Sequence, residues 1–190
     1  AGHNLHFIEG LIAKFSRDGH DILLDQWQGH TIHDEEKSHD LLEQSDIIIC
    51  EWALGNSVWY SNHTKPKQRL FIRFQRQEIE TNFPNKINWD SVEKMVFTAP
   101  YFHSKAIEQF SIPPEKTTFI PNYVDTSRYS LSKSSKSKYT IGMLGIVPRL
   151  KRLDRALDIL KIVRAKEPRF NLRIKGKLPE DYPWMLKREE

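Results

Sequence analysis

The sequence predicts an α/β protein made of two units with parallel sheets, and three observations lead to this class. Short apolar runs of strand length recur along the chain of 190 residues. Amphipathic helical patterns lie between several of these runs, as in βαβ units, whose parallel strands are joined by helices. A segment rich in Ser and Lys over residues 128–138 then interrupts the pattern, which starts again at residue 139.

The first unit is expected over residues 1–127 and opens on a helix. One helical stripe carries Leu5, Ile8, Ile12 and Phe15, and Gly19 has the position of a C-cap. The run Ile47–Cys50 is continuously apolar, which suits a strand covered on both faces. Strands are expected at 20–27, 46–51, 70–74, 94–99 and 117–120, and a helix at 101–110.

Residues 128–138 are expected to be a linker, and residues 139–190 to begin a second unit. A strand at 139–144 is followed by a helix on which Leu153, Leu157, Leu160 and Val163 face inward, and then by a strand at 171–175. Residues 181–190 have the pattern of a helix start. The residues from 139 onward are too few for a doubly wound domain, so we expect the second unit to be incomplete. The first unit lacks a strand before its helix, so we expect the chain to be a fragment.

Composition excludes several classes of protein. With 38% hydrophobic residues, the chain has the means to build a core. The single cysteine, Cys50, excludes an internal disulfide and leaves no Cys cluster for zinc. The longest apolar run is too short to span a bilayer, and no basic segment followed by an apolar run marks a secretion signal. The expected compartment is the cytoplasm.

The net charge of +4 is distributed unevenly. Residues 1–128 hold 13 Lys and Arg against 18 Asp and Glu, whereas residues 129–190 hold 16 against 7. This asymmetry indicates that the C-terminal part faces an anion such as a phosphate, a nucleic acid or an acidic membrane surface. A solvated basic face is the alternative.

The segment from Gly142 to Asp154 is the most informative, because it places a strand, a glycine and a short basic loop before an amphipathic helix. A helix N-terminus offers free N–H groups and the positive end of the helix dipole, which attract phosphate. Gly145 lacks a Cβ where a ligand approaches the backbone. Arg149 and Lys151 add cationic groups at the same place. A phosphate site and an ordinary exposed loop between strand and helix are both open on these grounds.

Two segments of this sequence resemble a known enzyme family. Thr118–Asp125 reads TFIPNYVD, which is similar to the "IPNGVD" segment of glycosyltransferases with the GT-B fold, of the family 4 type. The run GMLGIVPRLKRLDRALDIL, over 142–160, resembles that family's "GRLVPEKGVDRLLDAL" segment. Ala1-Gly2-His3 and Gly19-His20-Asp21-Ile22 resemble its glycine loop and "GHEV" strand. The resemblance covers nearly the whole chain and implies two Rossmann-like units.

The resemblance also implies roles for individual residues. Lys151 matches the lysine that contacts the donor diphosphate, whereas the family's companion arginine falls at Ile146, so Arg149 is our candidate replacement. In the first unit, Gln75 stands where the family often has a histidine near the reacting sugar, and a glutamine cannot act as a base. His3 is a second candidate on the acceptor side. The donor-phosphate residues are thus Gly145, Arg149 and Lys151, and no catalytic residue is assigned.

The activity implied is transfer of a sugar from a nucleotide diphosphate-sugar to a glycan or a lipid-linked acceptor, in cell-surface polysaccharide or glycolipid synthesis. Neither a metal nor a cofactor is expected, because cationic side chains and a helix terminus stabilise the departing diphosphate. A lipid-linked acceptor is compatible with peripheral association at the inner face of the membrane. The isolated fragment is expected to be inactive. The alternative is a basic module that binds nucleic acid or another polyanion, although the aromatic residues cluster away from the basic ones.

Two further groups of residues have competing interpretations. His30, His33, Asp34, His39 and Asp40 lie close together and suggest a metal site, but their spacing favours a solvated loop. Trp52, Trp59 and Tyr60 are candidates either for a sugar-binding face or for packing between helix and sheet.

Overall fold

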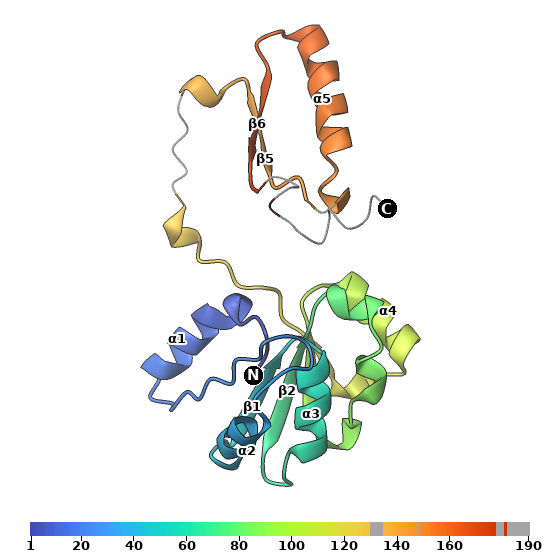
Figure 1. The fold of residues 1–190 in the computed structure, drawn as a ribbon. Coiled ribbons are helices and arrows are strands. Elements are labelled where there is room, and N and C mark those ends of the chain that lie inside the picture. Colours follow the sequence, from blue (N-terminus) through green and yellow to red (C-terminus); the bar gives the residue numbers. More distant parts are fainter. Residues whose placement is uncertain (130–134, 148, 178–180, 182–190) are drawn as a thin grey trace. The chain divides into compact units, whose positions relative to one another are not determined.

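The chain folds into two compact units, Ala1–Asp125 (unit 1) and Thr126–Glu190 (unit 2), in a computed structural model (Figure 1). The structure describes residues 1–129, 135–147, 149–177 and 181. The expected linker lies partly outside these residues, and so does nearly all of the helix expected at 181–190. Each unit is described below by itself.

Unit 1 contains, among its described residues, a four-stranded parallel sheet in the order β1-β2-β3-β4. Its strands are β1 (Ile47–Glu51), β2 (Arg69–Phe74), β3 (Val92–Phe97) and β4 (Thr117–Phe119). Ile48 lies opposite Leu70, and Ile72 lies opposite Met95. The four strands confirm the sequence predictions to within about two residues.

The helices of unit 1 connect these strands. α3 (Gly55–His63) joins β1 to β2, and α4 (Pro100–Phe110) joins β3 to β4. α1 (Glu9–Arg17) and α2 (Glu35–Glu43) precede the sheet, and Asp34 caps α2 by accepting a hydrogen bond from the Lys37 amide at 3.1 Å. The 3₁₀-helices are η1 (His6–Ile8), η2 (Gln77–Glu80), η3 (Pro84–Lys86), η4 (Trp89–Ser91), η5 (Pro114–Lys116), η6 (Thr126–Arg128), η7 (Ser135–Ser137) and η8 (Arg149–Lys151).

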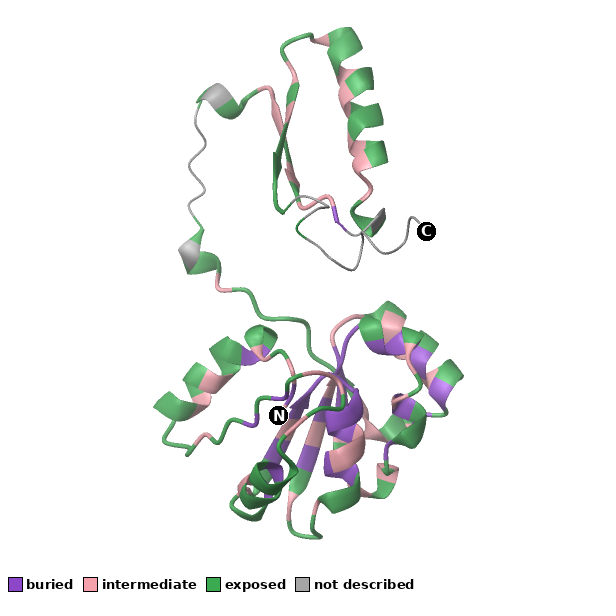
Figure 2. Cartoon of the chain, in the orientation of Figure 1, coloured by how far each residue is buried: buried purple, intermediate pink, exposed green. Residues whose placement is uncertain are grey.

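The core of unit 1 lies between the sheet and the helices that cover it (Figure 2). Leu70, Ile72, Phe74 and Phe97 are fully buried on β2 and β3. Cys50 is a buried free thiol, and burial raises its pKa to about 11, so it stays protonated at neutral pH. None of the helices among the described residues is long and apolar enough to cross a membrane.

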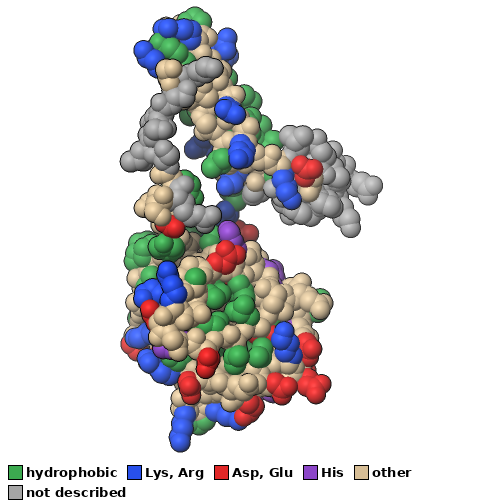
Figure 3. Space-filling model, turned by 90° about the vertical axis from the view of Figure 1, so that its left-hand side faces the viewer, with side chains coloured by type: hydrophobic (Ala, Val, Ile, Leu, Met, Phe, Trp, Pro, Cys, Tyr) green, Lys and Arg blue, Asp and Glu red, His purple; other side chains and the backbone are tan. Residues whose placement is uncertain are grey.

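The strand expected at 20–27 is the main error of the sequence-based assignment. The structure has an isolated parallel bridge between Gly2 and Gln26, and residues 20–25 form no regular strand. A strand needs a neighbouring strand to pair with. Among the described residues, the segment pairs only with Gly2: the Gly2 amide donates to the Asp25 carbonyl, and the Trp27 amide donates to the Gly2 carbonyl. Figure 3 shows hydrophobic side chains on the face of unit 1 that carries α1. Leu23 and Leu24, within the segment expected to be a strand, are both exposed.

Unit 2 consists, in its described part, of the parallel strands β5 (Thr140–Leu144) and β6 (Asn171–Lys175) joined by α5 (Leu153–Lys166). The sequence placed both strands correctly. Leu153, Leu160 and Val163 are half-buried on α5, as expected, whereas Leu157 is 50% exposed and therefore does not face inward. Both units are thus of the α/β class with parallel sheets.

The close approach of Gly2 to β1 gives a first test of this fold. A Cβ at residue 2 would lie 2.6 Å from the Glu51 carbonyl oxygen, and Gly2 has a φ of +152°. Hydrogen bonds hold the backbone on both sides of this contact, because the Gly2 amide donates to the Asp25 carbonyl and the Glu51 amide donates to the Ala1 carbonyl. The backbone therefore cannot move away from an added Cβ, and we expect Gly2→Ala to lower the free energy of unfolding by about 1–3 kcal/mol. Urea denaturation followed by tryptophan fluorescence measures this loss. Gly29→Ala is the matched control, because no atom lies within 4 Å of its added Cβ. Equal stabilities of the two variants would contradict the proposed backbone clash.

Candidate functional site

The carboxyl ends of β1 and β2 meet at one edge of the sheet of unit 1, which we call the carboxyl edge. Parallel strands all end at the same edge, and open α/β sheets bind their ligands there. The loop that carries Gly2 and His3 lies against this edge, since the Glu51 amide donates to the Ala1 carbonyl at 2.9 Å. Polar and aromatic side chains from five segments gather here: His3, His30, Glu51, Trp52, Arg73, Gln75 and Glu78.

A buried carboxylate, Glu51, organises the polar part of the carboxyl edge. Its side chain is fully buried at the last position of β1. Arg73 donates from Nη1 to Glu51 Oε2 at 2.5 Å, and Gln75 donates from Nε2 to Glu51 Oε1 at 2.7 Å. Burial raises the pKa of Glu51, and Arg73 opposes this rise. Both oxygens therefore have a partner, and the charge has a counter-ion.

Arg73 connects Glu51 to the segment Thr118–Asp125, which contains Asn122. Its second guanidinium nitrogen, Nη2, donates to Asn122 Oδ1 at 2.7 Å. The Arg73 side chain is only 11% exposed, so its planar fork is held between Glu51 and Asn122. The segment around Asn122 is thereby attached to the end of β2.

Gln75, a sequence-predicted candidate for the acceptor side, does reach the carboxyl edge. It is 8% exposed, and its amide nitrogen is used by Glu51. In this arrangement Gln75 supports the buried carboxylate, and its side chain presents little surface to a ligand.

Glu78 is a second buried carboxyl group behind the first. Its Oε1 accepts hydrogen bonds from the backbone amides of Ala53 and Gln75 at 3.0 and 3.2 Å. Its Oε2 is buried and has no partner among the described residues. Burial raises the pKa of Glu78 to about 7, with nearby Glu51 adding to the rise. The group is thus close to half-protonated at neutral pH.

His3 lies in an aromatic cluster at the same edge. Its ring centroid is 4.9 Å from that of His30 and 5.5 Å from that of Trp52. Burial, with His30 as a second cause, lowers the pKa of His3, so its imidazole is neutral at pH 7 and able to accept a proton. Trp52 has a left-handed φ of +76°, a strain that persists where surrounding contacts fix it. One such contact is its indole N–H, which donates to the Asn4 carbonyl at 2.9 Å.

The candidate phosphate loop of unit 2 begins where β5 ends. Gly145 follows β5 with a φ of +70°, and its amide donates to the Lys175 carbonyl at 2.7 Å. Gly176 follows β6 and packs so closely that a Cβ there would lie 2.8 Å from the Gly145 Cα. The carboxyl ends of both strands are therefore bare backbone, which a bulky anion could approach.

Lys151 is a cation that lies beside this backbone. Its Cε lies 3.8 Å from the place of a Cβ on Gly145, and its side chain is exposed. Arg152, the residue before α5, is bound to Asp154 by Nε–Oδ1 and Nη2–Oδ2 contacts of 2.9 and 2.5 Å. This pair lowers the pKa of Asp154 to about 2, and it leaves Arg152 less available to a ligand. The third predicted residue, Arg149, lies in η8, and its side chain falls outside the described residues.

The prediction that His30, His33, Asp34, His39 and Asp40 lie in a solvated loop is wrong in part. α2 begins at Glu35, and His33 stacks on Trp27 with ring centroids 3.8 Å apart. His39 lies edge-on to Trp59, and His30 lies beside His3. Among the described residues no group of three or more His, Cys, Asp or Glu side chains is arranged to hold a metal.

Sequence reasoning missed the central residues of the carboxyl edge, Glu51, Arg73 and Glu78. A signal was present for two of them, since Glu51 ends an isoleucine-rich run and Arg73 interrupts the apolar run Leu70–Phe74. Charged residues are rarely buried unless they are paired.

The sequence matches no family model and no curated protein.

Glu78 makes the stability of unit 1 depend on pH. Since its pKa in the folded state lies above the ordinary carboxyl value, the folded state binds more protons between about pH 4.3 and about pH 7. The free energy of unfolding therefore falls as pH rises through this window. Glu78→Gln imitates the protonated acid, so we expect it to match the parent near pH 4 and to be more stable by about 3 kcal/mol at pH 8.

Urea denaturation at several pH values measures this difference. Glu80→Gln is the control, because Glu80 is exposed and two residues away. A difference between Glu78→Gln and the parent that stays constant from pH 5 to pH 8 would contradict the assigned protonation.

Proposed function

We propose that this chain belongs to a metal-independent glycosyltransferase of the GT-B type, which transfers a sugar from a nucleoside diphosphate sugar to a glycan or lipid-linked acceptor. The observation that carries the proposal is the pair of glycines at the carboxyl ends of β5 and β6, with Lys151 beside them. This geometry coincides with the segment that resembles the donor-binding motif, so the local structure and the motif support the same assignment.

Unit 2 supplies the donor side in this proposal. The diphosphate lies over Gly145 and Gly176, where the absence of side chains leaves the backbone accessible. Lys151 and the N-terminus of α5 face the negative charge that develops as the diphosphate departs. Asp154, in the first turn of α5, is paired with Arg152, and this pairing reduces its repulsion of the phosphate.

Unit 1 supplies the acceptor side, and His3 is its proton-accepting group. Two observations support this role: the neutral state of the imidazole, and its position beside Trp52 at the carboxyl edge. Glu51 and Arg73 do not react in this scheme. They fix the strand ends and the Asn122 segment against which the acceptor binds.

Nucleotide binding tests the donor site. We expect Lys151→Ala to weaken the binding of UDP or GDP by about 1.5–3 kcal/mol, the cost of losing a hydrogen bond to a charged group. Isothermal titration calorimetry measures the affinity. Lys161→Ala is the matched control, because it removes the same charge from an exposed position within α5. Arg149→Ala should cost about as much as Lys151→Ala if Arg149 replaces the arginine absent at Ile146.

Unchanged affinity in Lys151→Ala would remove the basis for the donor site. Salt dependence separates the rival function, a module that binds nucleic acid. A polyanion site loses affinity steeply with salt, whereas a single-nucleotide site loses it modestly. Tight, strongly salt-dependent binding of RNA or DNA, with no binding of UDP or GDP, would favour the rival.

A further inference from the structure

Ala1 pairs with β1, the edge strand of the sheet, as a further strand would. The Ala1 nitrogen donates to the Ile49 carbonyl at 2.7 Å, and the Glu51 amide donates to the Ala1 carbonyl at 2.9 Å. Bonds from one residue to two positions of its neighbour that lie two residues apart are the parallel pattern. Ala1 therefore lies parallel to β1, on the side of β1 that faces away from β2.

Gly2 pairs in the same way with the segment that leads from α1 to α2. Its amide donates to the Asp25 carbonyl, and the Trp27 amide donates to the Gly2 carbonyl, both at 3.1 Å. The resulting bridge between Gly2 and Gln26 is parallel as well. Residues 1 and 2 thus hold residues 25–27 two strand spacings away from β1, a separation of about 9.5 Å.

The interval between β1 and residues 23–25, ahead of Ala1, has the width of one strand, and we call it the strand gap. A small cavity of about 40 Å³ lies within it, several times the volume that one water needs. The residues that line this cavity include Leu23 and Asp25 on one wall, Ile47–Ile49 of β1 on the other, and Tyr60 of α3. The gap is therefore bordered by backbone on two sides.

Backbone groups on both walls point into the strand gap. Along a strand, the N–H and C=O groups of one residue point to one side, and those of the next residue point to the other. Because the Ile49 carbonyl bonds to Ala1, the Ile49 amide and the Ile47 carbonyl face the same side, away from β2. On the opposite wall the Asp25 amide bonds to no described residue. Unpaired groups of this kind are a template for another strand.

The side chains beside the strand gap are apolar and only partly covered. Ile47 is 53% exposed although it belongs to a parallel sheet, and Leu23 is 41% exposed. Strands of parallel sheets are ordinarily covered on both faces, and exposed sheet edges usually carry charges or prolines. Neither protection is present at these two positions. A strand placed between them would bury both side chains.

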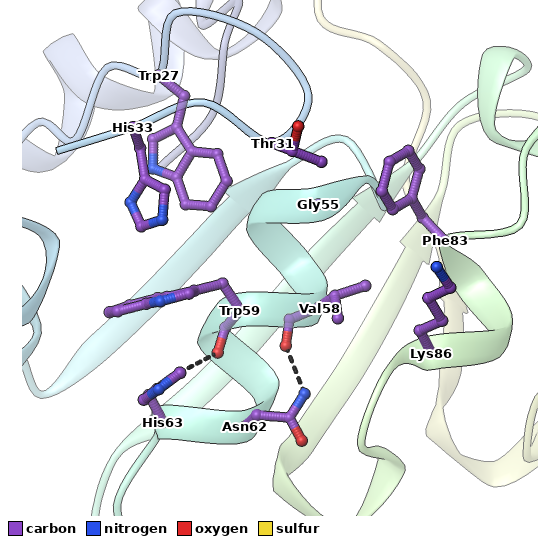
Figure 4. Close-up of a pocket in the computed structure, with 10 residues that line it drawn as sticks. All are labelled: Trp27, Thr31, His33, Gly55, Val58, Trp59, Asn62, His63, Phe83 and Lys86. Carbon is purple, nitrogen blue, oxygen red and sulfur yellow. Dashed lines mark hydrogen bonds between the residues drawn. The ribbon is translucent and has the colours of Figure 1, made fainter. Parts of the chain in front are cut away.

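The wall opposite β1 is held in place by the core of unit 1. The buried carboxylate of Asp25 accepts a hydrogen bond from the Trp27 indole at 2.6 Å. The Ser38 and Tyr60 hydroxyls donate to the same carboxylate oxygen at 2.8 Å each. Trp27 also stacks on His33, with ring centroids 3.8 Å apart (Figure 4). This wall is therefore preorganised, which reduces the entropy lost on binding.

We propose that the strand gap binds an extended apolar segment of another polypeptide, as an added strand parallel to β1. Its carbonyl groups accept from the Ile49 and Asp25 amides, and one of its amides donates to the Ile47 carbonyl. A helix satisfies its own backbone groups and would leave these three unpaired. A small ligand would not pair with both walls along their length. The inference does not rest on the proposed function.

Binding of a synthetic peptide tests the proposal. The probe is an acetylated peptide of three lysines followed by Val-Ile-Val-Ile-Val and a C-terminal amide, in which the lysines maintain solubility. We expect saturable binding to the full chain, with the hydrogen-exchange rates of the Ile49 and Asp25 amides falling about tenfold or more at saturation. NMR of the ¹⁵N-labelled chain measures both rates. The Cys50 amide, which faces β2, is the internal reference and should change little.

Substitutions at exposed positions beside the strand gap give a second test. Ile47→Gln and Leu23→Gln should each weaken peptide binding about tenfold, because a polar group is then buried against the added strand. Ile32→Gln is the matched control, since Ile32 is exposed in the same unit and does not line the gap. A peptide N-methylated at alternate residues lacks the donors for pairing and should not bind.

The proposal is overturned if the peptide does not bind, if it binds without slowing exchange at Ile49 and Asp25, or if the N-methylated peptide binds equally well. It is also overturned if the chain alone dimerises and protects these two amides, because the occupant is then a second copy. Lys151→Ala should leave peptide binding unchanged. Loss of nucleotide binding alone therefore counts against the donor site only.

Discussion

The buried ion pair of Glu51 and Arg73 is the interaction on which the carboxyl edge of unit 1 depends. Taking a carboxylate and a guanidinium out of water costs several kcal/mol for each ion, and good geometry with further hydrogen bonds must offset that cost. Here Gln75 and Asn122 supply those bonds, so four side chains from β1, β2 and the segment after β4 settle in one arrangement. Removing Arg73 would leave a fully buried charge without a counter-ion, whereas removing Asn122 would leave the pair intact. The ion pair therefore fixes where the strands end and, through those ends, where His3 and Trp52 lie.

Backbone contact at glycines is the second constraint, and it recurs in both units. Gly2 lies against the Glu51 carbonyl, Gly55 lies against the His30 carbonyl, and Gly176 lies against Gly145. At each position an added Cβ would come within 3 Å of another backbone atom, which packed backbone cannot relieve by changing a rotamer. The carboxyl edge, the start of α3 and the loop after β5 are therefore shaped by main chain as much as by side chains.

Local patterns in the sequence predict most of the strands but not the interior of unit 1. β1 follows from a continuous apolar run, and β6 follows from the alternation of Leu172 and Ile174 with polar residues. α2 escapes detection because its buried residues are Ser38 and Leu42, too few for a recognisable stripe. The strand expected at 20–27 does not form, because a strand needs a neighbouring strand to pair with, and the apolar pattern within a segment does not reveal whether one is present. Glu51, Arg73 and Asn122 come together across separations of 22 and 49 residues, and no local pattern encodes such contacts.

The two units differ in how much of a site they preorganise. In unit 1 the donors and acceptors around Asp25 and Glu51 are paired and buried, so the side chains that contact them are held in fixed positions. In the described part of unit 2, Lys151 is exposed, and a single apolar side chain, that of Val147, is buried. The charge of an exposed cation is screened by salt and discriminates little between ligands of the same charge. Under the proposed function, discrimination between substrates, which needs rigid and desolvated contacts, should therefore arise mainly in unit 1, whereas the loop after β5 would respond to a charge that all nucleoside diphosphates share.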